Sequence, residues 1–177
     1  TITSGQLNAS GGIRFAAAAS ATKRIIMSGG DGEVNVKGEV TIPANSATLT
    51  AGTAGSIFNY MDDVSSQTIR YFTAGGYYNL HLNNTSPSGA TLIAAMSATN
   101  VTGGVRVQSG TLHNGGFNIV GGPGDTIQVA DDAELDLTGA GAFPTGFLTF
   151  DFQPISRVRY RQTSAAITIA THTFGHL

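Results

Sequence analysis

The sequence predicts an all-β protein, and within that class a right-handed parallel β-helix (β-solenoid) of about eight coils. Three observations predict this fold. Apolar and polar residues alternate in most segments, glycine-rich breaks separate the segments, and similar stretches recur along the chain. Successive side chains of a strand lie on opposite faces, so each alternating segment has one apolar face to bury.

The expected strands are short and follow one another in chain order: 33–42, 78–83, 104–112, 126–129 and 133–137. Breaks such as SGGDG, TAGTAG and GGPGD favour turns between them. The residues that hold the apolar phase, and should therefore point inward, are Val34, Val36, Ile69, Leu80, Leu82, Val105, Val107, Leu112, Ile127, Val129, Leu135, Leu137, Val158 and Ile169. One alanine-rich run, 15–23, has helical propensity but no amphipathic stripe.

Internal repetition indicates two copies of one unit, a first copy at 1–104 and an incomplete second copy at 105–177 of the same continuous solenoid. For example, SGQL at 4–7 recurs as SGTL at 109–112. Tyr60 and Tyr160 are matched by a similar offset and should occupy the same place in the coil cross-section. A solenoid tolerates an incomplete copy because its coils contact only their neighbours. The alternative fold, tandem β-sandwiches, would tolerate it poorly.

The composition limits the classes of partner. Charged residues make up 11% of the chain, against ~25% in typical domains, so Ser, Thr, Asn and Gly must form the polar surface. That is common in secreted β-rich proteins. The net charge of −2 predicts no binding to nucleic acid. No cysteine is present, which excludes disulfides, and no apolar run is long enough to predict membrane insertion.

The run VSSQTIRYFTAGGYYNLHLNN at 64–84 resembles a strand pattern repeated in large secreted adhesins of Bacteroidetes and related bacteria. SGTLHNGGFNIV at 109–120 and SGQLNASGG at 4–12 resemble the stretch that follows it there. The resemblance covers most of the chain and implies a repetitive, β-helical stalk or adhesin region at the cell surface. It supplies no catalytic residue, and the second copy departs from it with FGHL at 174–177.

Clustered acidic residues are candidates for a catalytic site, because β-helices also carry polysaccharide lyases and hydrolases. The adjacent acids at 62–63 are typical turn formers. The other group is Asp131, Asp132, Glu134 and Asp136. Glu134 and Asp136 share a strand face but have no basic partner nearby in sequence. The alternating Arg157, Arg159 and Arg161 indicate a solvated strand face. We therefore expect no enzyme and no cofactor.

No metal site is expected either. His172 and His176 would face the same way on a strand, but about 13 Å apart, which is too far for one ion. GGPGD at 121–125 fits a turn better than a calcium-binding repeat. Four asparagines begin N-x-S/T sequons and are candidate glycosylation sites: Asn8, Asn83, Asn84 and Asn100.

The two ends of the chain predict self-assembly. Joining THTFGHL at 171–177 to the first residues gives FGHL-TIT-SGQL, in which Leu177 and Ile2 keep one inward phase. The expected assembly interface comprises Thr1, Ile2, Thr3, Leu7, Phe174, His176 and Leu177. We therefore expect a structural segment of an extracellular fibre or cell-surface adhesin that assembles head-to-tail with copies of itself. Surface glycans are further candidate partners. The alternative is a carbohydrate-binding or carbohydrate-cleaving β-helix.

Overall fold

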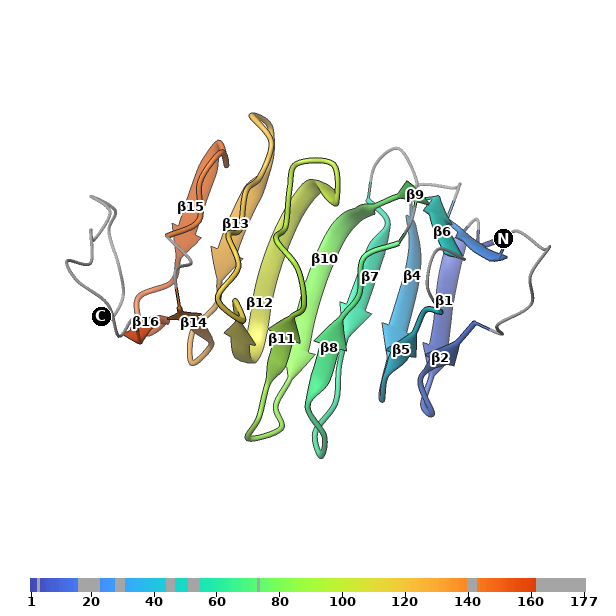
Figure 1. Cartoon of the computed structure of the whole chain (residues 1–177), viewed down its shortest axis with the longest axis horizontal. Coiled ribbons are helices and arrows are strands. Elements are labelled where there is room, and N and C mark those ends of the chain that lie inside the picture. Colours follow the sequence, from blue (N-terminus) through green and yellow to red (C-terminus); the bar gives the residue numbers. More distant parts are fainter. Residues whose placement is uncertain are drawn as a thin grey trace.

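The protein is a parallel β-solenoid of about six turns (Figure 1), seen here in a computed structural model. The structure describes residues 1–2, 4–15, 23–27, 31–43, 47–50, 55–72, 74–139 and 143–161. Over these ranges no segment is helical, and none could cross a membrane as a helix. Every pair of described strands is parallel, which confirms the solenoid and excludes the β-sandwich alternative. The described residues form about six coils, where eight were expected for the whole chain.

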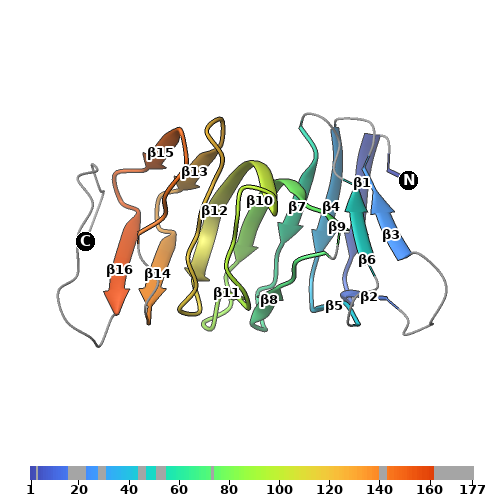
Figure 2. The same cartoon turned by 45° about the horizontal axis from the view of Figure 1, so that its top comes forward.

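One side of the solenoid, which we call the long face, carries one strand from each coil (Figures 1 and 2). In stacking order its strands are β1 (Ser4–Ala9), β4 (Asp31–Val36), β7 (Ile57–Tyr60), β10 (Tyr77–Asn84), the first part of β12 (Val101–His113), β13 (Thr126–Val129) and β15 (Thr149–Phe152). Register partners in adjacent coils are 22 to 27 residues apart, as in Phe58 with Leu80 and Leu7 with Val34. Coils of this length give fewer than eight coils over 177 residues.

Two further sides complete each coil. The second face holds β2 (Ile13–Arg14), β5 (Val40–Thr41), β8 (Gln67–Ile69), β11 (Ala90–Leu92), the end of β12, β14 (Glu134–Thr138) and β16 (Arg157–Arg161). The third face holds β3 (Lys23–Ile26), β6 (Ala47–Thr50) and β9 (Ala74–Gly75). Isolated bridges, Met96 with Ile119 and Val120 with Thr145, connect later coils.

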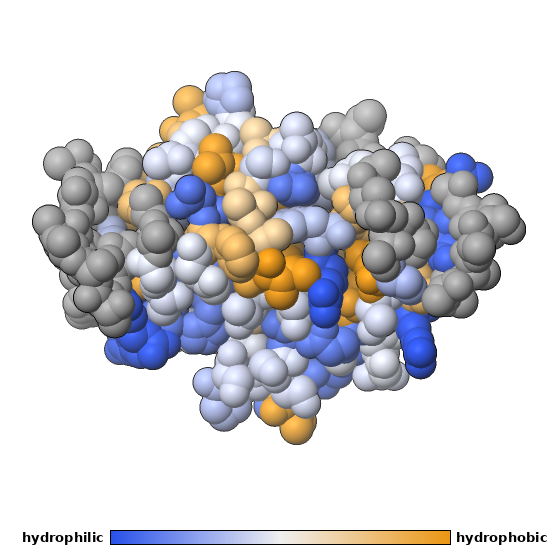
Figure 3. All heavy atoms as spheres, in the orientation of Figure 1, coloured by the Kyte–Doolittle hydropathy of each residue, from blue (hydrophilic) through white to orange (hydrophobic). Residues whose placement is uncertain are grey.

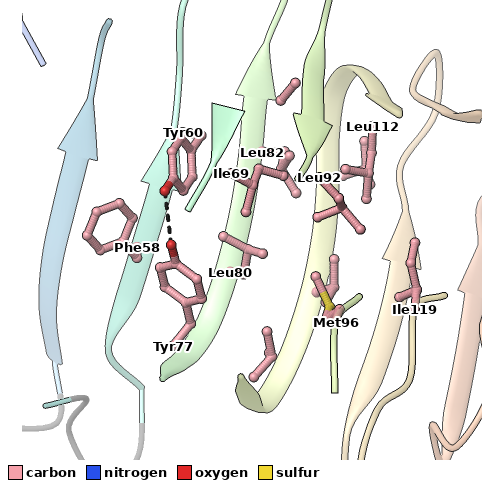
Figure 4. Close-up of a cluster of buried hydrophobic side chains, with 14 of the residues drawn as sticks. Phe58, Tyr60, Ile69, Tyr77, Leu80, Leu82, Leu92, Met96, Leu112 and Ile119 are labelled. Atoms are coloured by element: carbon pink, nitrogen blue, oxygen red, sulfur yellow. Dashed lines mark hydrogen bonds between the residues drawn. The ribbon is translucent and has the colours of Figure 1, made fainter. Parts of the chain in front are cut away.

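The predicted inward residues form the core. All of them that are described are at most 1% exposed, from Val34 to Val158, and Ile169 lies outside the described residues. Equivalent inward residues of successive coils lie next to one another in the parallel register, as Leu80 does beside Val105. We call such a row of register partners a file. Figure 4 shows four of the inward residues, Ile69, Leu80, Leu82 and Leu112, lying together in the interior. The strand phase predicted from alternation is therefore confirmed.

Aromatic residues fill the early part of this core. Phe58 packs against Tyr60 and Tyr77, with ring centroids 5.3 and 5.2 Å apart. The hydroxyls of Tyr60 and Tyr77 lie 2.9 Å apart (Figure 4), and Tyr77 also donates to the carbonyl oxygen of Arg70. A hydroxyl has one proton, so Tyr60 is the donor to Tyr77, and it accepts from the Arg70 amide at 3.2 Å. Both phenols are thereby satisfied inside an apolar core.

An asparagine ladder follows the outer side of the long face. The Asn35 side-chain amide donates to Asn8 at 3.0 Å, and that of Asn59 donates to Asn35 at 2.8 Å. Asn83 then donates to Asn59 at 3.2 Å. Each amide has a donor and an acceptor, so stacked copies link coil to coil. Asn35 and Asn59 are buried by their neighbours in the stack although they point away from the core.

The matched pair Tyr60 and Tyr160 corrects the expectation drawn from repetition. Tyr60 lies on the long face, in register with Leu82, whereas Tyr160 lies on the second face, in register with Leu137. The two therefore do not share a place in the cross-section. An offset near 100 residues spans about four coils of unequal length. Residues that match in sequence at this offset can therefore lie on different faces of the solenoid. The boundary between 104 and 105 falls within β12, and the division into two units stays a prediction.

The outer surface has no segregated apolar side in the view of Figure 3, where hydrophobic and hydrophilic residues lie interspersed. The large hydrophobic residues that are exposed come from different coils: Leu7, Val64, Ile93, Phe117, Leu148 and Ile155. Single exposed apolar residues of this kind are normal on a soluble surface. Leu7 differs from the others because its position belongs to an inward file.

Candidate functional site

The exposed side of the first coil is the first candidate site. Leu7 is in register with Val34, and Val34 is in register with Phe58, so the three residues belong to one file. Val34 and Phe58 are 0% and 1% exposed, but Leu7 is 43% exposed. Among the described strands β1 pairs only with β4, so its other edge has no strand partner. This coil presents an apolar side chain and a strand edge together, the combination that favours pairing with another chain.

The other expected interface residues near the start lie in the same coil. Thr1 is exposed, and Ile2 packs against the core. The Ile2 amide donates to the Ile26 carbonyl oxygen at 2.7 Å, which places these residues beside β3 on the third face. Thr3, Phe174, His176 and Leu177 lie outside the described residues, as do His172 and the run 16–22. The predicted junction between the two ends therefore stays a prediction.

A charged cluster on the second face is the next candidate. The register of β14 and β16 places Glu134 opposite Arg157 and Asp136 opposite Arg159. Glu134 accepts from Arg157 at 3.2 Å and from Arg159 at 2.9 Å. The alternating arginines lie on one exposed strand face, as predicted. No basic residue lies close to Glu134 and Asp136 in sequence, and the arginines meet these acids only through stacking of the coils.

Asp136 is the centre of this cluster, which we call the Asp136 cluster: His113, Glu134, Asp136, Arg157, Arg159 and Arg161. The Asp136 side chain is 0% exposed. Its carboxylate accepts from Arg161 Nε at 2.9 and 3.0 Å and lies 2.7 Å from His113 Nδ1. Burial alone would raise the pKa of Asp136, but the hydrogen bonds and charges of Arg161 and His113 outweigh it and hold the pKa below its usual value.

This geometry suits a clamp between coils better than acid–base chemistry. A carboxylate whose pKa is lowered stays ionised and is a poor proton donor at neutral pH. Both carboxylates in the Asp136 cluster are engaged by guanidinium groups from the next coil. The Asp136 cluster therefore fixes β16 on β14.

Three other acids, Asp62, Asp125 and Asp131, accept hydrogen bonds from backbone amides at turns. Asp62 accepts from the amides of Val64 and Ser65 at 2.9 and 3.1 Å, and from Gly38 in the adjacent coil at 3.0 Å. These bonds, that of Val64 above all, lower the pKa of Asp62. Asp131 accepts from the Ile155 amide at 3.1 Å, and Asp125 in GGPGD accepts from the Gly122 amide at 2.6 Å. Asp62 and Asp125 thus have the turn roles predicted for their segments.

The four sequon asparagines differ in accessibility. Asn8 is exposed, whereas Asn83 takes part in the asparagine ladder. Asn84 is 1% exposed, and its side-chain amide donates to the Ser65 carbonyl and to Gln67, each at 3.0 Å. Asn100 is half-buried and accepts from the Ser97 amide at 2.9 Å. Asn8 is the most accessible of the four and Asn84 the least, and glycosylation of any of them stays a prediction.

Comparison of the chain with protein-family models, with curated proteins and with solved structures gave no match. The β-solenoid therefore rests on the strand pairing described above. The resemblance to bacterial adhesins is carried by the sequence pattern alone, and only its repetitive β-solenoid part is shown.

Proposed function

We propose that this chain is a structural segment of an extracellular fibre or cell-surface adhesin, in which one solenoid stacks head-to-tail on another copy. The observation that carries the proposal is the exposure of Leu7 within an inward file whose next members are buried. A second coil placed against β1 would cover Leu7 and pair the open strand edge. Full burial of an exposed leucine contributes about 1.5–3 kcal/mol, and covering the 43% of Leu7 that is exposed would contribute about half of that.

Other features support the surface role. The chain has few charged residues and no cysteine, so a fibre built from it would depend on its core and coil-to-coil ladders. The asparagine ladder and the Asp136 cluster supply such links along the stacking direction. The resemblance of 64–84 to adhesin repeats supports placement at the cell surface. Copies of this chain are the proposed partners, whether as tandem units of one polypeptide or as separate subunits.

Substitution of Leu7 tests the proposal. Leu7→Lys places a charge in the contact, so we expect self-association to weaken at least tenfold, because hot-spot contacts are worth about 2 kcal/mol or more. Sedimentation velocity over a concentration series measures the association, and negative-stain electron microscopy shows whether rods lengthen.

Val64→Lys is the matched control, since Val64 is 79% exposed on a turn between β7 and β8. We expect it to associate as the wild type does. A wild-type chain that stays monomeric at millimolar concentration would contradict the proposal. So would a Leu7→Lys chain that associates normally.

A further inference from the structure

The outer side of the long face contains a groove over β10, β12 and β13. It has a volume of about 220 Å³ and is lined by Asn79, His81, Gly104, Arg106, Thr126 and Gln128, among others. Pockets for drug-sized ligands measure about 300–1,000 Å³, so this groove suits one small unit. It lies far along the stack from the open edge of β1, with β4 and β7 between them.

Glycine produces the groove. Asn79, Gly104 and Thr126 are successive members of one outward file, so the middle position has no side chain. A Cβ on Gly104 would lie 2.7 Å from the Thr126 carbonyl oxygen, and one on Gly103 would lie 2.7 Å from the Tyr78 ring. At Gly104 the close atom belongs to the backbone, so only glycine fits there, whereas a side chain at 103 would displace the Tyr78 ring. The register also shifts between Tyr77 and Asn79, where β12 has one residue more than β10.

The adjoining file supplies polar groups of different kinds. His81, Arg106 and Gln128 are in register across the three strands. Burial, and secondarily the Arg106 charge, lower the pKa of His81 to about 4. The imidazole is therefore neutral at pH 7 and offers one donor and one acceptor. Together with the Asn79 amide and the Thr126 hydroxyl, it provides several hydrogen-bonding groups within one small groove.

Arg106 supplies the charge. Its side chain is exposed, and the ion pairs of the described residues do not include it. The next carboxylate along the file, Asp151, accepts instead from Gln128 and from Gln153, the latter at 2.6 Å. The Arg106 guanidinium can therefore bind a planar carboxylate with two parallel hydrogen bonds.

We propose that this groove binds an acidic sugar unit, a hexuronate within a polysaccharide. Arg106 binds the carboxylate, and Asn79, His81, Thr126 and Gln128 hydrogen-bond the ring hydroxyls. A sugar matches the groove because it presents many hydroxyls around a small ring, and the groove is open on the outer surface, so a unit inside a polymer can enter. The inference goes beyond the proposed fibre, since it concerns a different surface and does not require self-association.

Calorimetric titration of the monomeric chain with trigalacturonate, and with its methyl ester, tests this site. The ester has the same hydroxyls without the charge. We expect the wild type to bind the acid and to bind the ester at least about tenfold more weakly, as charge-assisted pairs predict. Arg106→Gln should weaken binding of the acid by a similar factor. Arg24→Gln, on exposed Arg24 of the third face, is the matched control and should bind as the wild type does.

Each other result overturns the assignment. Absence of wild-type binding at millimolar ligand rejects the site, and equal binding of acid and ester rejects the role of the carboxylate. An equal loss in both arginine variants indicates general electrostatic attraction instead of a site. Circular dichroism checks the fold of every variant. Should Arg106→Gln fail to fold, Arg106→Lys, which keeps the charge but lacks the planar fork, should still weaken binding of the acid.

Discussion

Single side chains in this protein act mainly through their counterparts in the next coil. Asn59 illustrates this, since its amide donates to Asn35 in one neighbouring coil and accepts from Asn83 in the other. An isolated asparagine on a strand would weaken it, because asparagine has low strand propensity. Stacked asparagines satisfy one another instead, and a buried amide left unpaired would cost about 1–3 kcal/mol.

Asp136 gives a residue-scale prediction of pH dependence. An unfolded aspartate titrates near pH ~3.9, and the pKa of Asp136 in the folded chain is lower. Its contribution to stability is therefore complete above about pH 4 and is lost as the pH falls through the folded pKa. Asp136→Asn should lower the free energy of unfolding at pH 7 by about 1.5–3 kcal/mol, the range for hydrogen bonds to charged groups.

Urea unfolding at pH 7 and at pH 2 measures this effect, and the difference from the wild type should shrink at pH 2. Asp63→Asn is the control, because the Asp63 side chain is 65% exposed and pairs with Lys37 at 3.3 Å. It should change stability by less than about 1 kcal/mol at either pH. An Asp136→Asn effect that persists unchanged at pH 2 would show that lost packing, and not charge, is the cause.

At the scale of elements, β12 decides how a coil turns its corner. Its first part pairs with β10 and β13 on the long face, and its end pairs with β11 and β14 on the second face. Gly110 lies where the pairing changes and has a φ of 71°. A Cβ there would overlap the carbonyl oxygen of Asn84 in the preceding coil. The corner therefore requires glycine for two reasons, the left-handed backbone and the close approach.

Gly110→Ala should consequently lower the free energy of unfolding by at least about 2 kcal/mol, since the left-handed conformation alone costs ~1–2 kcal/mol. Thermal unfolding followed by circular dichroism measures the loss. Gly124→Ala is the matched control, because no atom lies within 4 Å of its added Cβ and its φ is not positive. Equal stability of the two variants would contradict the assigned role of the corner.

At the scale of the whole molecule, each coil contacts its neighbours and no others. The protection of backbone amides from hydrogen exchange should therefore vary along the solenoid. Strands of the long face between β4 and β13 have partners on both edges, whereas β1 has a described partner on one edge only. Alternate amides of β1 therefore lack a carbonyl acceptor among the described strands. Local opening sets the rate at which such amides exchange hydrogen with solvent.

Hydrogen–deuterium exchange of the dilute chain should accordingly be faster in β1 than in β10 and the first part of β12. Raising the protein concentration should slow exchange in β1 if copies stack there, and should leave β10 unchanged. Mass spectrometry of peptides covering 4–9 and 77–84 measures both. Uniform protection of the two peptides at low concentration would contradict nearest-neighbour stability.

The sequence by itself determined the fold class and the phase of each strand. Alternation is a local property, so it correctly assigned Val34, Leu82, Leu135 and the other described inward residues to the core. Of the glycine-rich breaks, GGPGD lies in a turn as predicted, whereas the last two residues of SGGDG belong to β4 and most of TAGTAG lies outside the described residues. The assignment of inward residues succeeded because burial of one face is decided within a few residues of the chain.

Only the tertiary structure decided which residues of different coils meet. Coil length varies from 22 to 27 residues with the corners, so the register between coils cannot be obtained from one strand's pattern. For this reason Tyr60 and Tyr160, which the sequence repeat paired, lie on different faces of the solenoid. The same register brings Asp136 to Arg161, stacks Asn35 on Asn59, and sets Gly104 between Asn79 and Thr126. The candidate sites consist of contacts between coils, and contacts of that kind are fixed by stacking.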